Sequence, residues 1–248
     1  MDALNAALLV NLLGFTVGIA LYAMLAVMVV RHRSASTASG VDVLLFITAA
    51  LGLVWNAGEL VVLIERDFDT PLTFAFLAAA AYSALGFLPS VVVHSAQNEA
   101  GRSRVVAWFA YAMSFAAAFL HFRAAAVGEA VPSALALQML TFGAITLAAV
   151  MLFLNFRQRI EKKAIWAAAL LVFAVSALHL SHRTGESSWW VELVAHQSSV
   201  PLALAILYQN FRFAFADLFL KRAISLMLIA AVAFVLYVGI AAPILRYH

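Results

Sequence analysis

Eight apolar stretches, each long enough to cross a lipid bilayer, dominate this chain of 248 residues. A membrane-spanning helix needs about 20 apolar residues, because each residue advances the helix by about 1.5 Å. With 66% hydrophobic and 11% charged residues, the chain carries more apolar side chain than a soluble domain can bury. We therefore predict an all-α integral membrane protein. The expected spans are 4–30, 41–64, 71–95, 105–122, 132–156, 164–182, 189–211 and 223–245.

The basic residues predict which ends of these spans face the cytoplasm. Of the 15 Lys and Arg residues, 11 lie in "RHRSASTASG", "QNEAGRSR", "RQRIEKK" and "RFAFADLFLKR", which fall on one side of an eight-span bundle. Short loops rich in Lys and Arg stay in the cytoplasm, so we expect cytoplasmic loops at 31–40, 96–104 and 157–163 and both chain ends outside. Because these residues are spread over loops, membrane lipid is the expected partner and nucleic acid is not.

No internal repeat or flexible linker divides the chain, so one polytopic domain is expected over 1–248. Pro89 and Pro201 lie within expected spans, where each removes a backbone hydrogen bond and tends to kink the helix. Between the last two spans, "YQNFRFAFADLFLKR" mixes aromatic and charged residues at helical spacing. This pattern predicts a cytoplasmic interfacial helix over 207–222 that either anchors the chain or transmits a signal.

Ionisable residues gather near the outer ends of several expected spans. Such a residue is costly inside a membrane unless it is paired or faces a cavity, so each is a candidate functional residue. The six that share the outer half are Glu59, His121, His179, His182, Glu192 and His196. Taken singly, the shallow His121 and His182 are also explained as solvated residues at helix ends, and His196 with Glu192 as a buried pair. Together the six predict a site for a ligand, metal or cofactor.

Two kinds of cofactor suit this cluster, and the absence of cysteine restricts a metal to histidine and carboxylate ligands. A b-type haem, the favoured cofactor, needs axial histidines on two different helices with an apolar slot between them. Glu192, one turn from His196, could hold the ring nitrogen of that histidine that does not ligate. The residues expected to bind the haem are His121, His179, His196 and Glu192. A Zn, Cu or Fe ion instead needs three or four ligands around one point. The residues expected to hold that ion are His179, His182, His196 and Glu59.

Several segments resemble the N-terminal membrane region of bacterial sensor histidine kinases. They include "ALGFLPSVVVHS", "VSALHLSH" and "ESSWWVELVAHQSSVPLALAILYQNFRFAFADLFLKRAISL". The resemblance covers 80–245 and is most specific from Ser176 to Leu226. The matching positions include His179, Glu192, His196, Tyr208, Arg212 and Asp217.

This resemblance implies a signal-transduction module in the bacterial cytoplasmic (inner) membrane, with a cytoplasmic kinase module as its partner. The chain departs from the family by ending at His248 without a dimerisation helix or an ATP-binding motif. Kinase activity is therefore not expected of these residues. A homodimer is left open.

The leading functional hypothesis is a sensory or redox-input domain that binds its cofactor outside and signals through the seventh span. The first alternative is a membrane cytochrome or a metal-dependent membrane enzyme, with Glu59 or Glu192 as general base. The second is a proton-linked transporter in which the same two glutamates carry protons. The sequence has no HExxH motif and no inverted repeat, which speaks against metal-dependent hydrolysis and against transport.

Overall fold

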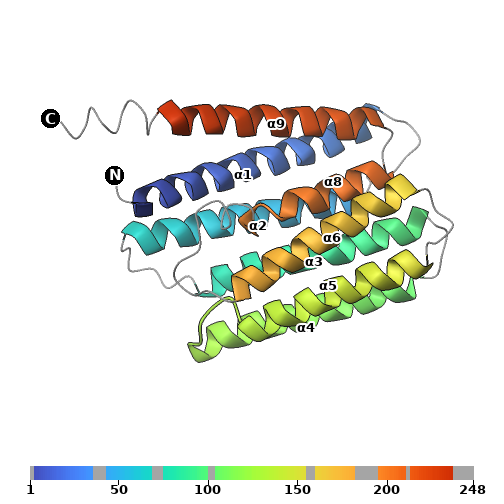
Figure 1. Ribbon diagram of the computed structural model, residues 1–248, viewed down its shortest axis with the longest axis horizontal. Helices are drawn as coiled ribbons and strands as arrows, with labels where there is room; N and C mark the ends of the chain where they lie inside the picture. Colours follow the sequence, from blue (N-terminus) through green and yellow to red (C-terminus); the bar gives the residue numbers. More distant parts are fainter. Residues whose placement is uncertain are drawn as a thin grey trace.

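The computed structural model describes residues 3–35, 43–68, 75–99, 104–154, 160–181, 195–210 and 213–236. Every regular element in these ranges is an α-helix, so the all-α prediction is confirmed for them. In chain order the helices are α1 (Ala3–Ala35), α2 (Val43–Phe68), α3 (Ala75–Glu99), α4 (Val105–Val127), α5 (Ala134–Leu154), α6 (Ile160–Ser181), α8 (Ser199–Asn210) and α9 (Phe213–Leu236). Figure 1 shows them side by side in one bundle.

Six of the described helices, α1 to α6, are long and apolar enough to cross a membrane. This length and composition fit the predicted multi-pass membrane protein. The apolar helix α8 is shorter, with its apolar part at Ser199–Tyr208. Most of the expected seventh span before α8 lies outside the described residues, so the total of eight spans and their orientation remain predictions.

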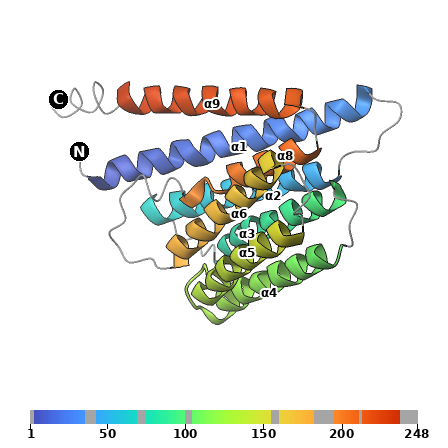
Figure 2. The same ribbon diagram turned by 45° about the vertical axis from the view of Figure 1, so that its right-hand side comes forward.

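Helix α3 is the centre of the bundle. Its apolar segment is 78% buried, whereas those of α1 and α4 are each 33% buried. It packs against α2, α4 and α8, with smaller contacts to α5 and α6 (Figures 1 and 2). The many Ala residues of α3 explain this position, because small side chains let several helices approach closely. The core of the protein is therefore built around α3.

Two glycines bring α1 and α2 into close contact. A Cβ atom added at Gly18 of α1 would collide with the side chain of Asn56 on α2, and one added at Gly52 of α2 would collide with the ring of Tyr22 on α1. Asn56 and Tyr22 are both fully buried. Each glycine thus leaves the space that a large polar or aromatic side chain of the other helix fills, which is a common device in membrane bundles.

The C-terminal helices divide differently from the prediction. The sequence predicts a separate interfacial helix over 207–222, but α8 ends at Asn210 and α9 runs from Phe213 to Leu236. Residues 213–236 contain no Gly or Pro, so nothing stops the helix at Arg222. Helix α9 lies at the edge of the bundle against α1 and α8 (Figures 1 and 2).

Candidate functional site

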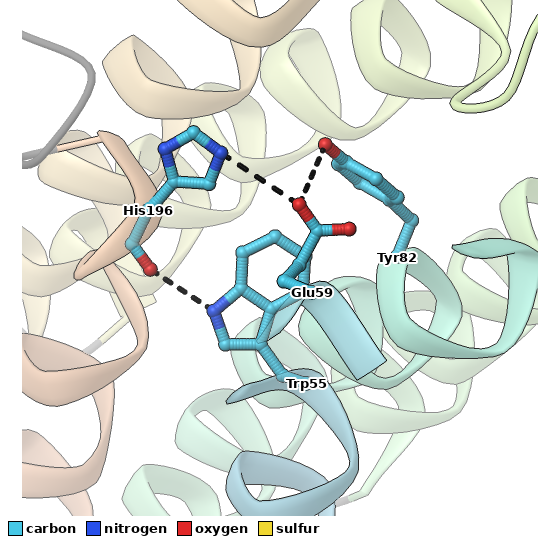
Figure 3. A network of polar contacts seen from close by, with 4 residues as sticks. All are labelled: Trp55, Glu59, Tyr82 and His196. Carbon is cyan, nitrogen blue, oxygen red and sulfur yellow. Dashed lines mark hydrogen bonds and ion pairs between the residues drawn. The ribbon is translucent and has the colours of Figure 1, made fainter. Parts of the chain in front are cut away.

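A buried carboxylate lies at the centre of the candidate site. Glu59 of α2 is only 4% exposed. Its Oε2 atom lies 3.7 Å from Nε2 of His196 and accepts a hydrogen bond of 3.3 Å from the hydroxyl of Tyr82 on α3. Figure 3 shows the three side chains meeting at this oxygen. Two consecutive helices, α2 and α3, and the distant segment that contains His196 therefore converge on one carboxylate. We call Trp55, Glu59, Tyr82 and His196 the Glu59 network.

The helix that contains His196 is interrupted just after this residue. Residues 195–196 are helical, residues 197–198 form a turn, and α8 begins at Ser199. In an unbroken helix the Val200 N–H would bond to the carbonyl of His196, and residue 201 would bond to that of Gln197. Pro201 has no N–H, and Val200 instead donates to the Gln197 carbonyl at 3.0 Å. The carbonyl of His196 is thereby released from the helix.

Trp55 takes up that released carbonyl. Its indole Nε1 donates a hydrogen bond of 3.0 Å to the His196 oxygen (Figure 3). Trp55 precedes Glu59 by four residues, so both side chains lie on the same face of α2. The indole and imidazole planes are within 14° of parallel, with centroids 6.2 Å apart. One helix face therefore holds both the backbone and the side chain of His196.

Aromatic rings separate this network from water. Phe15 of α1 packs edge-on against His196 with a centroid distance of 5.2 Å, and Tyr82 packs edge-on against Trp55 at 5.1 Å. Trp55 and Tyr82 are buried, and the side chain of His196 is 12% exposed. Interactions between charged groups are stronger in such a poorly hydrated place than at a surface, and an uncompensated charge is correspondingly costly.

His121 of α4 packs against the ring of Tyr82. Its ring centroid is 5.9 Å from that of Tyr82, and the residue is completely buried. The backbone N–H of Ser133, just before α5, donates to Nδ1 of His121 at 3.1 Å. A neutral imidazole that accepts at Nδ1 carries its proton on Nε2, by assignment from the hydrogen bond. His121 is therefore a hydrogen-bond donor at Nε2, and this atom has no partner among the described residues.

This geometry bears on the predicted cofactors. A histidine that binds a metal or haem iron through Nε2 must carry its proton on Nδ1, which the Ser133 N–H disfavours at His121. In His196, Nε2 faces Glu59. No group of three or more His, Asp or Glu residues within the described ranges could hold a metal ion. His182 and Glu192, which belong to the expected metal and haem sites, lie outside the described residues, so both sites stay predictions.

The remaining predicted residues are placed as follows. His179 lies in the last turn of α6 and is partly buried. His182 and Glu192 lie outside the described residues, so the structure leaves their roles as predictions. Of the six candidates, the structure brings Glu59 and His196 into contact and adds His121 beyond Tyr82.

Sequence reasoning missed Trp55 and Tyr82, which orient the two titratable residues. Both read as ordinary core aromatics, and both are indeed buried. The signal that was present is the spacing of Trp55 and Glu59, which places them on one helix face. For Tyr82 only its position in the apolar run of α3 was available, and that does not single it out.

Comparison of the chain with protein-family models, with curated proteins and with solved structures finds no match. The chemistry of the site therefore rests on its own geometry. A carboxylate, an imidazole and a phenol in contact within an apolar bundle are groups that bind and exchange protons.

Proposed function

We propose that the chain is the sensory membrane domain of a bacterial signalling protein, and that its input is a proton bound at the Glu59–His196 pair. The observation that carries this proposal is the contact between Glu59 and His196 inside an apolar bundle. Ionisable residues at such depth are costly, and they occur where a protein uses them. Histidine is the side chain whose charge responds to pH near neutrality.

The sign of the response follows from the contacts. An ionised Glu59 attracts a charged His196 and accepts the Tyr82 hydrogen bond. As the pH falls through neutrality His196 gains a proton, and its charged imidazole is then attracted more strongly to the ionised Glu59. Within the described ranges His196 and Tyr82 contact this carboxylate, His121 packs against Tyr82, and Phe15 of α1 packs against His196. Lowering the pH from 8 to 5 should therefore tighten the contact between α2 and the residues that precede α8.

This proposal keeps the sensory role predicted from the sequence and replaces the cofactor by a proton. Absorbance and elemental analysis of the purified chain separate the two readings. A haem gives a Soret band, and a metal site gives one metal per chain. A protein that contains neither, yet responds to pH through Glu59, supports the proton as input.

The test uses the full chain in lipid nanodiscs. Because the chain has no cysteine, single cysteines can be placed freely. Spin labels at exposed Ile224 of α9 and exposed Phe115 of α4 report the distance across the bundle between pH 5 and pH 8. We expect a pH-dependent distance distribution in the parent and none in Glu59→Gln.

Asp217→Asn is the matched control. Like Glu59→Gln, it replaces a carboxylate on a helix by a neutral amide, but this carboxylate lies outside the Glu59 network. The carboxylate of Asp217 is exposed and pairs with Lys221 on the same helix at 2.8 Å. Its variant should respond to pH like the parent. A response that survives unchanged in Glu59→Gln would overturn the proposed input.

A proton-linked transporter is the second candidate, and the interruption of the helix at Gln197 and Ser198 favours it. Transporters commonly place such breaks beside their binding sites. Liposomes that contain the chain and a trapped pH indicator distinguish the two functions. Proton uptake that Glu59→Gln abolishes would indicate transport, whereas a pH-dependent conformation without flux indicates sensing.

A further inference from the structure

We infer that Trp55 is a positioning residue that couples the protonation of the Glu59–His196 pair to helix α8, through the hydrogen bond it donates to the His196 carbonyl. The inference rests on the proposed function of that pair. It assigns to Trp55 a role beyond filling the core, namely holding the segment before α8 in register with α2.

The interruption of the helix at residues 197–198 changes the backbone hydrogen bonds around His196. Pro201 cannot donate to the Gln197 carbonyl, Val200 donates there instead, and the His196 carbonyl is left to Trp55. Trp55 gives this carbonyl a hydrogen-bond donor in an apolar environment, where an unpaired polar group is unfavourable. The indole N–H therefore fixes the break in one geometry.

The imidazole of His196 contacts the same face of α2 as its carbonyl does. Trp55 contacts the ring of His196 as well as its carbonyl, and Glu59 extends from the next turn of α2. A movement of the imidazole away from Glu59 must alter its packing on the indole and, through the same residue, the carbonyl bond. Trp55 thus contacts both the imidazole of His196, which takes up the proton, and the backbone carbonyl of His196, which precedes α8.

Helix α8 links the segment that contains His196 to the C-terminal helix α9. Helix α8 is buried among α2, α3 and α6, and Leu202, Ala203 and Ile206 have no exposed surface. A closely packed helix of 12 residues moves as a unit rather than bending. It contacts α9, the helix that follows it in the chain, and α9 rests on α1 at the edge of the bundle. A change at His196 consequently reaches the C-terminal helix.

The competing explanation is that Trp55 only fills the core. A comparison with Trp166 of α6 distinguishes this explanation from the positioning role. Both tryptophans are buried, with exposed fractions of 0% and 1%. Trp55 donates to a carbonyl, whereas the Nε1 atom of Trp166 has no hydrogen-bond partner within the described part of the chain. Trp55→Phe and Trp166→Phe therefore remove similar volume, but only the first removes a hydrogen bond.

The experiment measures the distance between spin labels at Ile224→Cys and Phe115→Cys in nanodiscs, as a function of pH. We expect Trp55→Phe to reduce the pH-dependent change in the ratio of the two conformations about fivefold, as expected for one hydrogen bond. Trp166→Phe should retain the parent's response. Glu59→Gln is measured beside them, so that a missing input is distinguished from a missing link.

Pro201→Ala provides a second, independent test, should Trp55→Phe fail to fold. Alanine restores the N–H at 201, so the Gln197 and His196 carbonyls can bond within a continuous helix. The carbonyl would then no longer depend on Trp55, and the pH response should fall in the same direction. A response in Trp55→Phe equal to that in Trp166→Phe, or an unchanged response in Pro201→Ala, overturns the inference while leaving the proposed function intact. The proposed function itself fails if Glu59→Gln still responds.

Discussion

The hydroxyl of Tyr82 on the central helix α3 donates a hydrogen bond of 3.3 Å to the carboxylate of Glu59 on α2. Tyr82→Phe removes this donor and keeps the ring. We expect the free energy of unfolding to fall by about 1 kcal/mol, as for other single hydrogen bonds inside membrane proteins. We also expect the pH response of the Ile224–Phe115 distance to shift.

Tyr111→Phe is the control for this prediction. The hydroxyl of Tyr111 lies 3.2 Å from Nδ1 of His94, so this variant also loses a hydrogen bond between side chains, but away from Glu59. It should lose comparable stability in a denaturant titration and keep the parent's pH response. An unchanged response in both variants would show that Tyr82 plays no part in proton sensing.

His121 should be a hydrogen-bonding residue rather than a cofactor ligand. Because the Ser133 N–H donates to its Nδ1, His121→Asn offers a carbonyl oxygen in place of that acceptor, whereas His121→Leu offers none. Ser133 precedes α5, and its carbonyl accepts from Leu137 N at 3.1 Å, so losing the acceptor should loosen the start of α5. The midpoint temperature of thermal unfolding should be higher for His121→Asn than for His121→Leu. If the parent protein contains haem or a metal and both variants lose it, His121 is instead a cofactor ligand.

The fold class could be predicted from the sequence because one physical requirement decides it. A run of about 20 apolar residues in a membrane must satisfy its backbone internally, and a helix does so with local bonds alone. The run at 105–122 corresponds to α4 (Val105–Val127), and the extension to Val127 reflects Gly128, whose positive φ of 74° ends the helix. Such boundaries depend on local chemistry that the sequence displays.

The site could be predicted only in part, because its contacts join distant segments. Depth along the helices placed Glu59 and His196 in the same half, and these two do meet. Nothing in the sequence shows that Pro201 would release a carbonyl to Trp55, since that outcome depends on α2 packing beside the break. The direction of the Ser133 hydrogen bond to His121 is likewise a tertiary fact, and it assigns the proton of a neutral imidazole to Nε2.

Gly52→Ala should destabilise the bundle far more than Gly143→Ala, although an added Cβ collides with a neighbour at both positions. At Gly52 the neighbour is the buried ring of Tyr22, which has no room to turn. At Gly143 it is the end of the flexible side chain of Met113, which can adopt another rotamer. Overpacking in a rigid core costs about 1–3 kcal/mol. Denaturant titrations of the two variants that give equal losses would contradict this difference.

Asp217 and Lys221 should form a surface ion pair that affects titration more than folding. Their charged atoms lie 2.8 Å apart on one helix, and both side chains are exposed. The hydrogen bond from Lys221 to Asp217, and then the attraction of its charge, raise the pKa of Lys221 above its ordinary value. Because a raised pKa favours the protonated form in the fold, the pair supports folding at neutral pH and is lost as alkaline pH passes the raised pKa. Asp217→Asn should lower the pKa of Lys221, measured by NMR of its labelled side chain, and leave unfolding at neutral pH almost unchanged, since solvent screens exposed pairs. An unchanged Lys221 titration would show that the two side chains do not pair in the membrane-bound protein.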